Sequence, residues 1–180
     1  MKRLSLFIVV FAFGFVYAQD FNQSMVKIMK NMKGYTVDLV EKMPAEHFSF
    51  RPTDSVRTFA EQVQHMVAIQ HFFLNFQLKG NGDGNPGEAI QSAFEYAASL
   101  EKKDLMPLLN EQFDQCIAFF ENASDKDFKR EFVFGTPDNS QKSDYFSTAM
   151  LVRDHISHHR AQLIVYLRLN NIKPPQYHGF

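Results

Sequence analysis

Apolar residues recur at three- and four-residue spacing in four long stretches of this 180-residue chain. That spacing gathers them on one face of an α-helix, because a helix turns once in about 3.6 residues. The pattern predicts long helices near residues 20–43, 58–78, 102–121 and 147–169. In the first stretch the apolar face consists of Met25, Ile28, Met29, Met32, Tyr35, Leu39 and Met43.

Proline and capping residues support several of these boundaries. Pro44 closes the first helix, and Thr58 with Glu61 has the sequence pattern of a capping box at the start of the second. A shorter helix is expected within residues 88–100, and residues 132–134 suit a short extended piece. Four long amphipathic helices without convincing strands predict an all-α fold, an up-and-down four-helix bundle.

The fourth stretch carries an unusual set of polar residues on one face. His155 and His159 are four residues apart, so on a helix one lies a turn above the other. Thr148, Gln162 and Tyr166 share this face, where an ordinary bundle helix would place Leu or Ile. Two imidazoles at this spacing can reach one metal ion, although such pairs also occur by chance on helix surfaces.

A third histidine lies on the second predicted helix. His65 shares a face with apolar residues, where a lone histidine is more often structural than a metal ligand. Together with His155 and His159 it would complete a three-histidine site in the bundle interior. Such a set leaves a fourth coordination position open, as in catalytic zinc sites. His158 points about 100° away from His159, so we assign it to packing or to support of the ligands.

The identity of the ion is left open by these ligands. Three neutral imidazoles suit zinc, nickel, iron or copper and do not choose among them. Because clustered imidazoles must be neutral to bind, metal affinity is expected to fall as the pH drops through about 6.5. In a further alternative the three histidines are only structural and the bundle holds no metal.

Two residues are candidates for supporting roles. Gln162 lies one turn from His159 and could hydrogen-bond a water molecule, a ligand carboxylate or a histidine ring N–H. Glu61 lies one turn before His65, so its carboxylate could cap the helix, orient the imidazole or do neither. No residue is identified as a catalytic acid, base or nucleophile. Cys116 is the one cysteine and suits a buried apolar position better than a nucleophilic role.

The first eighteen residues have the build of a secretory signal peptide. Lys2 and Arg3 form a basic start, an apolar run follows, and Ala18 is the small residue expected before a cleavage site. A membrane anchor is the alternative, but the run is shorter than the roughly 20 residues needed to span a bilayer. We therefore expect residues 1–18 to be removed, leaving a single domain over 19–180 in a periplasmic or secreted protein.

Charge narrows the range of partners. The formal net charge is −1, and it becomes −3 once Lys2 and Arg3 leave with the signal peptide. Neither value suggests a nucleic-acid partner. Contact with a membrane is expected only through the export signal. A small-molecule substrate is the expected partner, and the sequence also allows a homodimer.

The residues around the histidines resemble a known family. His65 early in the second helix, together with residues 155–163 and 166–168, resembles the DinB/YfiT-like four-helix bundle proteins. The resemblance covers most of the mature chain and is most specific in the C-terminal segment. It implies that one histidine of the second helix and the pair of the fourth hold a divalent metal, which assigns this role to the three histidines above. Ala161 stands where the family usually has Gly, and alanine favours the helix.

The resemblance implies a metal site but no single reaction, because the family includes thiol-dependent transferases, isomerases and many proteins of unknown activity. Our first hypothesis is a metal-dependent enzyme, hydrolase-like or a transferase, that acts on an unknown small molecule. The ion would lower the pKa of a bound water or of a substrate thiol. An exported location counts against a thiol transferase, whose cosubstrates are cytosolic reductants. The alternative is a non-enzymatic metal-binding or partner-binding bundle.

Overall fold

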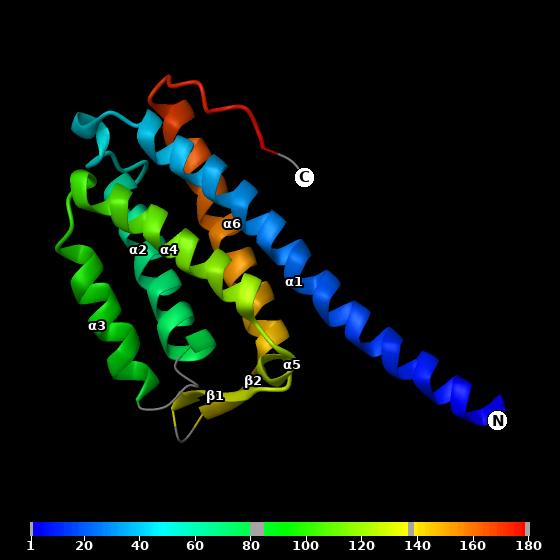
Figure 1. Ribbon diagram of the computed structural model, residues 1–180. Coiled ribbons are helices and arrows are strands. Elements are labelled where there is room, and N and C mark those ends of the chain that lie inside the picture. Colours follow the sequence, from blue (N-terminus) through cyan, green and yellow to red (C-terminus); the bar gives the residue numbers. More distant parts are fainter. Residues whose placement is uncertain (1, 80–84, 137–138, 179–180) are drawn as a thin grey trace.

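The computed structural model describes residues 2–79, 85–136 and 139–178 (Figure 1). A 3-10 turn at Ala45–His47 follows the first helix, and a π-helical turn at Phe73–Lys79 continues the second. The helices are α1 (Lys2–Lys42), α2 (Phe59–Phe72), α3 (Pro86–Ala98), α4 (Lys102–Asn122), α5 (Asp125–Phe128) and α6 (Tyr145–Leu169), and the strands are β1 (Glu131–Thr136) and β2 (Asn139–Asp144).

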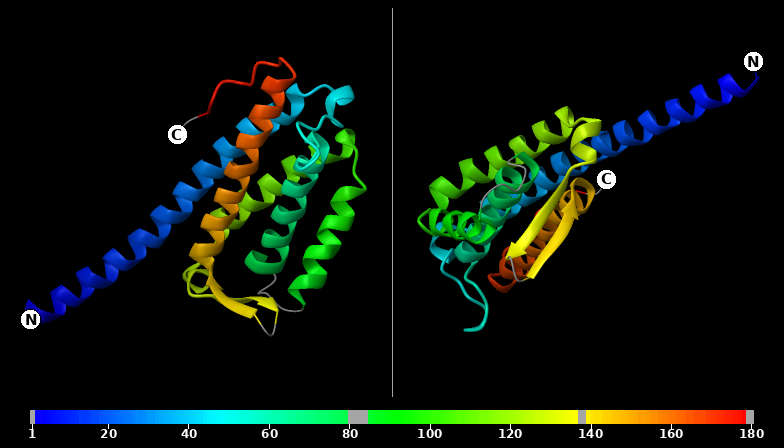
Figure 2. Two further views of the ribbon diagram at one scale, coloured as in Figure 1. Left: turned by 180° about the vertical axis from the view of Figure 1, so that it is seen from behind. Right: turned by 90° about the horizontal axis from the view of Figure 1, so that it is seen from below.

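The helices α1, α2, α4 and α6 form the predicted four-helix bundle (Figures 1 and 2). The helix α1 packs against α4 and α6, and α2 packs against the same two helices. Consecutive helices α1 and α2 are therefore diagonal to each other across the core. The short helix α3 packs along α2 and returns the chain to the other end, so that α4 runs in the same direction as α2. The fold class is confirmed, but the chain does not pass up and down between neighbouring core helices in sequence order.

The observed helix ends lie close to the predicted ones except at the N-terminus. The helix α1 begins at Lys2 and not near residue 20, because nothing in the apolar leader interrupts it. Its first part projects beyond the bundle (Figure 1). Among the described residues, no helix is both long and apolar enough to cross a bilayer. At the other end of the chain, α6 starts at Tyr145 because the Asp144 carboxylate caps it, accepting from the Ser147 backbone N–H at 2.7 Å.

A β-hairpin joins α5 to α6. The strands β1 and β2 pair antiparallel, with Glu131 opposite Asp144 and Phe132 opposite Ser143. Sequence reasoning expected only the short extended piece at 132–134, because β2 is polar throughout and has no alternation of apolar residues. Residues 137–138, in the predicted turn, lie outside the described part. The hairpin closes one end of the bundle, beneath the N-terminus of α6 (Figure 1).

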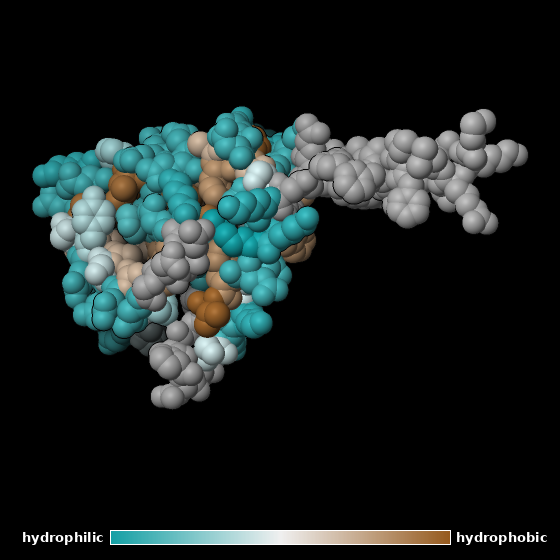
Figure 3. Space-filling model, turned by 60° about the horizontal axis from the view of Figure 1, so that its bottom comes forward, coloured by the Kyte–Doolittle hydropathy of each residue, from teal (hydrophilic) through white to brown (hydrophobic). Residues whose placement is uncertain are grey.

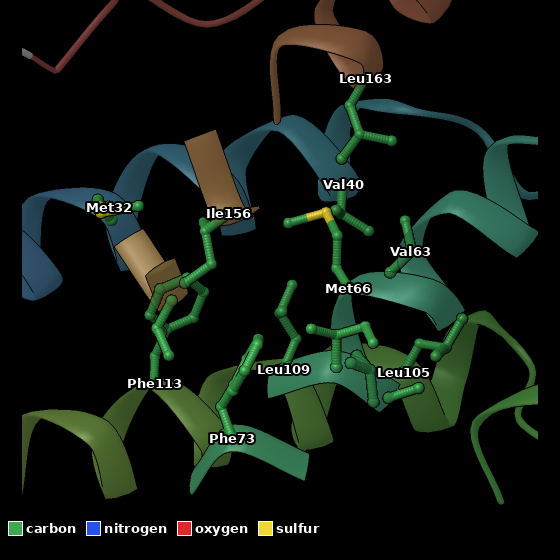
Figure 4. Close-up of a cluster of buried hydrophobic side chains, with 14 of the residues drawn as sticks. Met32, Val40, Val63, Met66, Phe73, Leu105, Leu109, Phe113, Ile156 and Leu163 are labelled. Atoms are coloured by element: carbon green, nitrogen blue, oxygen red, sulfur yellow. The ribbon is translucent and has the colours of Figure 1, made fainter. Parts of the chain in front are cut away.

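The core lies between the four long helices, as the apolar faces predict (Figure 4). In that view α2 contributes Val63 and Met66, and α6 contributes Ile156 and Leu163. Cys116 on α4 is also buried, and the loss of solvent raises the pKa of its thiol to about 11. This agrees with its prediction as a small core residue and not a nucleophile. The outer face seen in Figure 3 is mostly hydrophilic, with apolar residues in separate patches.

Candidate metal centre

The three predicted ligands meet where α2 packs against α6. His155 and His159 lie one turn apart on α6, and His65 comes from α2. One ring nitrogen from each residue lies within 4.8 Å of those of the other two. The centroid of the His65 ring is 5.1 Å from that of His155 and 4.6 Å from that of His159. We call these three residues the histidine cluster.

The spacing inside the histidine cluster fits one shared ion. The Nε2 atoms of His65 and His155 are 3.2 Å apart. Two nitrogens bound to one tetrahedral zinc at about 2.1 Å would be about 3.4 Å apart. The other ring nitrogen of His65, Nδ1, is buried and has no hydrogen-bond partner in the described part of the chain.

Burial keeps the histidine cluster neutral. It lowers the pKa of His65 to about 4 and that of His155 to about 3, and the Arg57 guanidinium and the neighbouring histidines add to both shifts. Burial also lowers the pKa of His159, against a hydrogen bond to Gln162 that raises it. Neutral imidazoles have a free lone pair for a metal. The expected loss of metal affinity on acidification therefore moves below the pH of about 6.5 predicted from the sequence.

Two glutamine amides surround the remaining nitrogen of His159. The Nδ1 atom of His159 is 2.8 Å from the Gln162 Oε1 and 2.8 Å from the Gln62 Nε2. Gln62 also donates from Nε2 to the Gln162 oxygen. If Gln162 Oε1 accepts from both groups, the proton of His159 sits on Nδ1 and Nε2 is free to bind a metal. The predicted contact of Gln162 with a histidine ring is thus present.

The other candidates lie at different places. The Glu61 carboxylate accepts from the Thr58 backbone N–H at 2.7 Å and pairs with Arg51 at 3.0 Å, so it caps α2. Of the roles that the sequence left open for Glu61, this is the capping one. His158 is exposed and does not belong to the histidine cluster. His71, on another face of α2, is 3.2 Å from Asn75.

Sequence reasoning missed three neighbours of the histidine cluster. Gln62 is buried beside it, and its place three residues before His65 on the same helix was an available signal. Phe94 on α3 stacks on the His65 ring at 5.3 Å. Arg57 lies in the loop before α2. Nothing local in the sequence indicates that α3 or this loop folds against the histidines.

A cavity of about 840 Å³ lies on the other side of Gln62 and Gln162, the two residues that contact His159, and none of the three clustered histidines is among its lining residues. Gln62, Gln162 and Tyr166 line one side of it, and Arg57 and the rest of the loop before α2 line the other. Its volume is within the range of small-molecule sites. We call it the loop cavity.

Comparisons with known proteins identify the family of this chain. The sequence profile of the DinB superfamily matches residues 30–163. The chain belongs to the DinB superfamily. Within this superfamily, the uncharacterized protein YjoA of Bacillus subtilis (strain 168) is 25% identical over 136 residues, which cover 76% of this chain and 82% of YjoA. The range matched by the superfamily profile, residues 30–163, includes all three residues of the histidine cluster.

Solved structures share the DinB fold. The crystal structure of YjoA has a TM-score of 0.66 at 25% identity and covers 86% of this chain and 97% of that one. YfiT from Bacillus subtilis, described as a probable metal-dependent hydrolase with an unusual four-helix bundle topology, has a TM-score of 0.63 at 19% identity, covering 84% and 89%. A mycothiol-dependent maleylpyruvate isomerase has a TM-score of 0.63 at 12% identity, covering 79% and 60%. At such identities the last two show the fold alone.

Proposed function

We propose that this DinB-superfamily protein is a metal-dependent enzyme, a hydrolase or a transferase, that acts on a small molecule. The observation that carries the proposal is the histidine cluster, in which three neutral imidazoles converge beside a cavity of about 840 Å³. The description of YfiT as a probable metal-dependent hydrolase supports it. So does the mycothiol-dependent isomerase, a second enzyme with this fold.

Each residue around the histidine cluster would have a separate role in such a site. His65, His155 and His159 would hold the ion, and Gln162 would keep the proton of His159 on Nδ1, away from the ion. Phe94 of α3 stacks on one face of the His65 ring and would hold its orientation. When bound, a divalent ion acts as a Lewis acid that lowers the pKa of a water or a thiol.

The ligand set favours an enzyme over a purely structural metal site. In the described chain, three side chains form the cluster, and no cysteine, aspartate or glutamate joins them as a fourth ligand. Structural zinc sites use four protein ligands, whereas catalytic sites keep one position for water or substrate. A fully protein-ligated ion would instead favour the non-enzymatic metal-binding bundle. We further propose that the protein acts outside the cytoplasm, which the signal-peptide pattern of residues 1–18 supports.

Metal analysis of protein purified without a histidine tag tests the proposal. We expect close to one divalent ion per chain in the wild type, and little in His155→Ala and His159→Ala. His158→Ala is the matched control, because His158 is an exposed histidine on the same helix outside the histidine cluster. It should keep the metal. Equal losses from all three variants, or no metal in the wild type, would contradict the proposed site.

A further inference from the structure

The loop cavity is connected with the histidine cluster through two glutamines. Gln62 and Gln162 line it and also contact the Nδ1 atom of His159. On its opposite side the cavity is bounded by the loop before α2, which carries two arginines. The charged residues of the lining are Arg51, Asp54, Arg57 and Glu61.

The two arginines differ in what they already bind. Arg51 pairs with the Glu61 carboxylate through contacts of 3.0 and 3.2 Å, so its charge is balanced. The guanidinium of Arg57 makes no hydrogen bond or ion pair with any residue in the described part of the chain. Asp54 also lines the cavity. The lining therefore holds two arginines and two carboxylates. Arg51 and Glu61 pair with each other, and of the remaining two, Arg57 is the residue whose backbone is bonded to α6.

The backbone of Arg57 is anchored to the helix that carries the histidine pair. The hydroxyl of Tyr166 on α6 donates to the Arg57 carbonyl. Tyr166 is buried and packs edge-on against the Phe50 and Phe59 rings at 6.2 and 6.1 Å. It also lies one turn after Gln162 on α6. The core therefore holds the backbone of Arg57 at a set place beside the histidine cluster, while its exposed guanidinium is free to bind.

We propose that Arg57 binds an oxyanion group, a carboxylate or a phosphate, of a small molecule held in the loop cavity. A guanidinium matches such groups because two parallel N–H donors can reach two oxygens. The Gln62 and Gln162 side chains at the cavity wall are polar and uncharged, so they do not oppose the anion. This inference rests on the proposed function, since it assigns the substrate of that same site to the small organic acids and phosphate esters.

Calorimetric titration of the full-length protein, metal-loaded and metal-stripped, tests the inference. The probes are succinate, inorganic phosphate and the uncharged analogue succinamide. We compare the wild type with Arg57→Gln and Arg57→Lys, and with Arg168→Gln as control. Arg168 is an exposed arginine on α6 that does not line the cavity. Metal content is measured in parallel for each variant, so that loss of the ion and loss of the anion are recorded separately.

Charged hydrogen bonds of this kind predict that Arg57→Gln weakens succinate or phosphate binding by about tenfold or more. Arg57→Lys should lose less, Arg168→Gln should bind like the wild type, and succinamide should not bind. The tighter of the two anions identifies the oxyanion that the cavity prefers. If the protein takes up no metal ion but still binds the anion in an Arg57-dependent way, the proposed metal-dependent function is refuted while the anion site is supported. Absence of anion binding to the wild type, or equal binding by wild type and Arg57→Gln, overturns the inference.

Discussion

Replacing Gln162 by alanine should reduce metal affinity while leaving the bundle almost as stable. The Gln162 oxygen lies 2.8 Å from Nδ1 of His159, and Gln62 Nε2 lies 2.8 Å from the same nitrogen. Without Gln162, the Gln62 N–H is left to donate to Nδ1, and the imidazole proton moves to Nε2. A metal ion can then bind Nε2 only after this proton is lost or after the imidazole changes to the other tautomer, and both lower the metal affinity.

The two effects of this substitution differ in size. Loss of a partner that orients a metal-binding histidine typically costs about 10–100-fold in affinity, or about 1.4–2.8 kcal/mol. The fold loses the two hydrogen bonds accepted by the Gln162 oxygen and keeps one in their place, from Gln62 to Nδ1 of His159. The net loss of one hydrogen bond is worth about 0.5–1.5 kcal/mol, and a few tenths are regained because alanine is the better helix former. The free energy of unfolding of the metal-free protein should therefore fall by about 1 kcal/mol or less.

Zinc affinity is measured by competition with a chromophoric chelator, and stability by urea unfolding of the metal-stripped protein. Gln162→Glu is the informative control, because its carboxylate can still accept from Nδ1 of His159 and should keep affinity at or above the wild-type level. Unchanged zinc affinity in Gln162→Ala would refute the reasoning. An equal loss of zinc affinity in Gln162→Glu and Gln162→Ala would also refute it, because the affinity would then not depend on a hydrogen-bond acceptor at position 162.

Two further predictions concern pH and processing. Because His65 and His155 have folded-state pKa values of about 4 and 3, below about 6.5 in the unfolded chain, the unfolded state binds more protons as the pH falls from 6.5 towards 4. The metal-free wild type should therefore lose stability between pH 7 and pH 5, and His155→Gln should lose less; equal shifts of the urea midpoint would contradict this. Mass spectrometry of protein from its own host should find a mature chain beginning at Gln19, whereas an intact Met1 in the soluble fraction would disprove removal of the leader.

The fold class and the long helices could be predicted because their signals are local. An apolar residue every three or four positions is enough to define a helix face, and Pro44 and the Thr58–Glu61 capping box mark ends that the structure also has, to within two residues. The hairpin was mostly missed, since the polar strand β2 is held by pairing with β1 and not by an apolar face of its own. The order of helices around the core was also missed, because it depends on where α3 returns the chain.

The sequence alone determined that His155 and His159 share a helix face, because their spacing and the pitch of the helix leave no other arrangement. It also placed Gln162 one turn away, within reach of a ring. Only the tertiary structure decided that His65 completes the set, because that requires α2 to lie beside α6.

The positions of Gln62 and Arg57 near the histidine cluster were also decided only by the tertiary structure. Their neighbours in space are about 100 residues distant in the sequence, as in the separation of 97 positions between Gln62 and His159. A local sequence pattern predicts on which face of its own helix a side chain lies. It does not predict which helix or loop packs against that face. That identity is set by burial of all the apolar faces together.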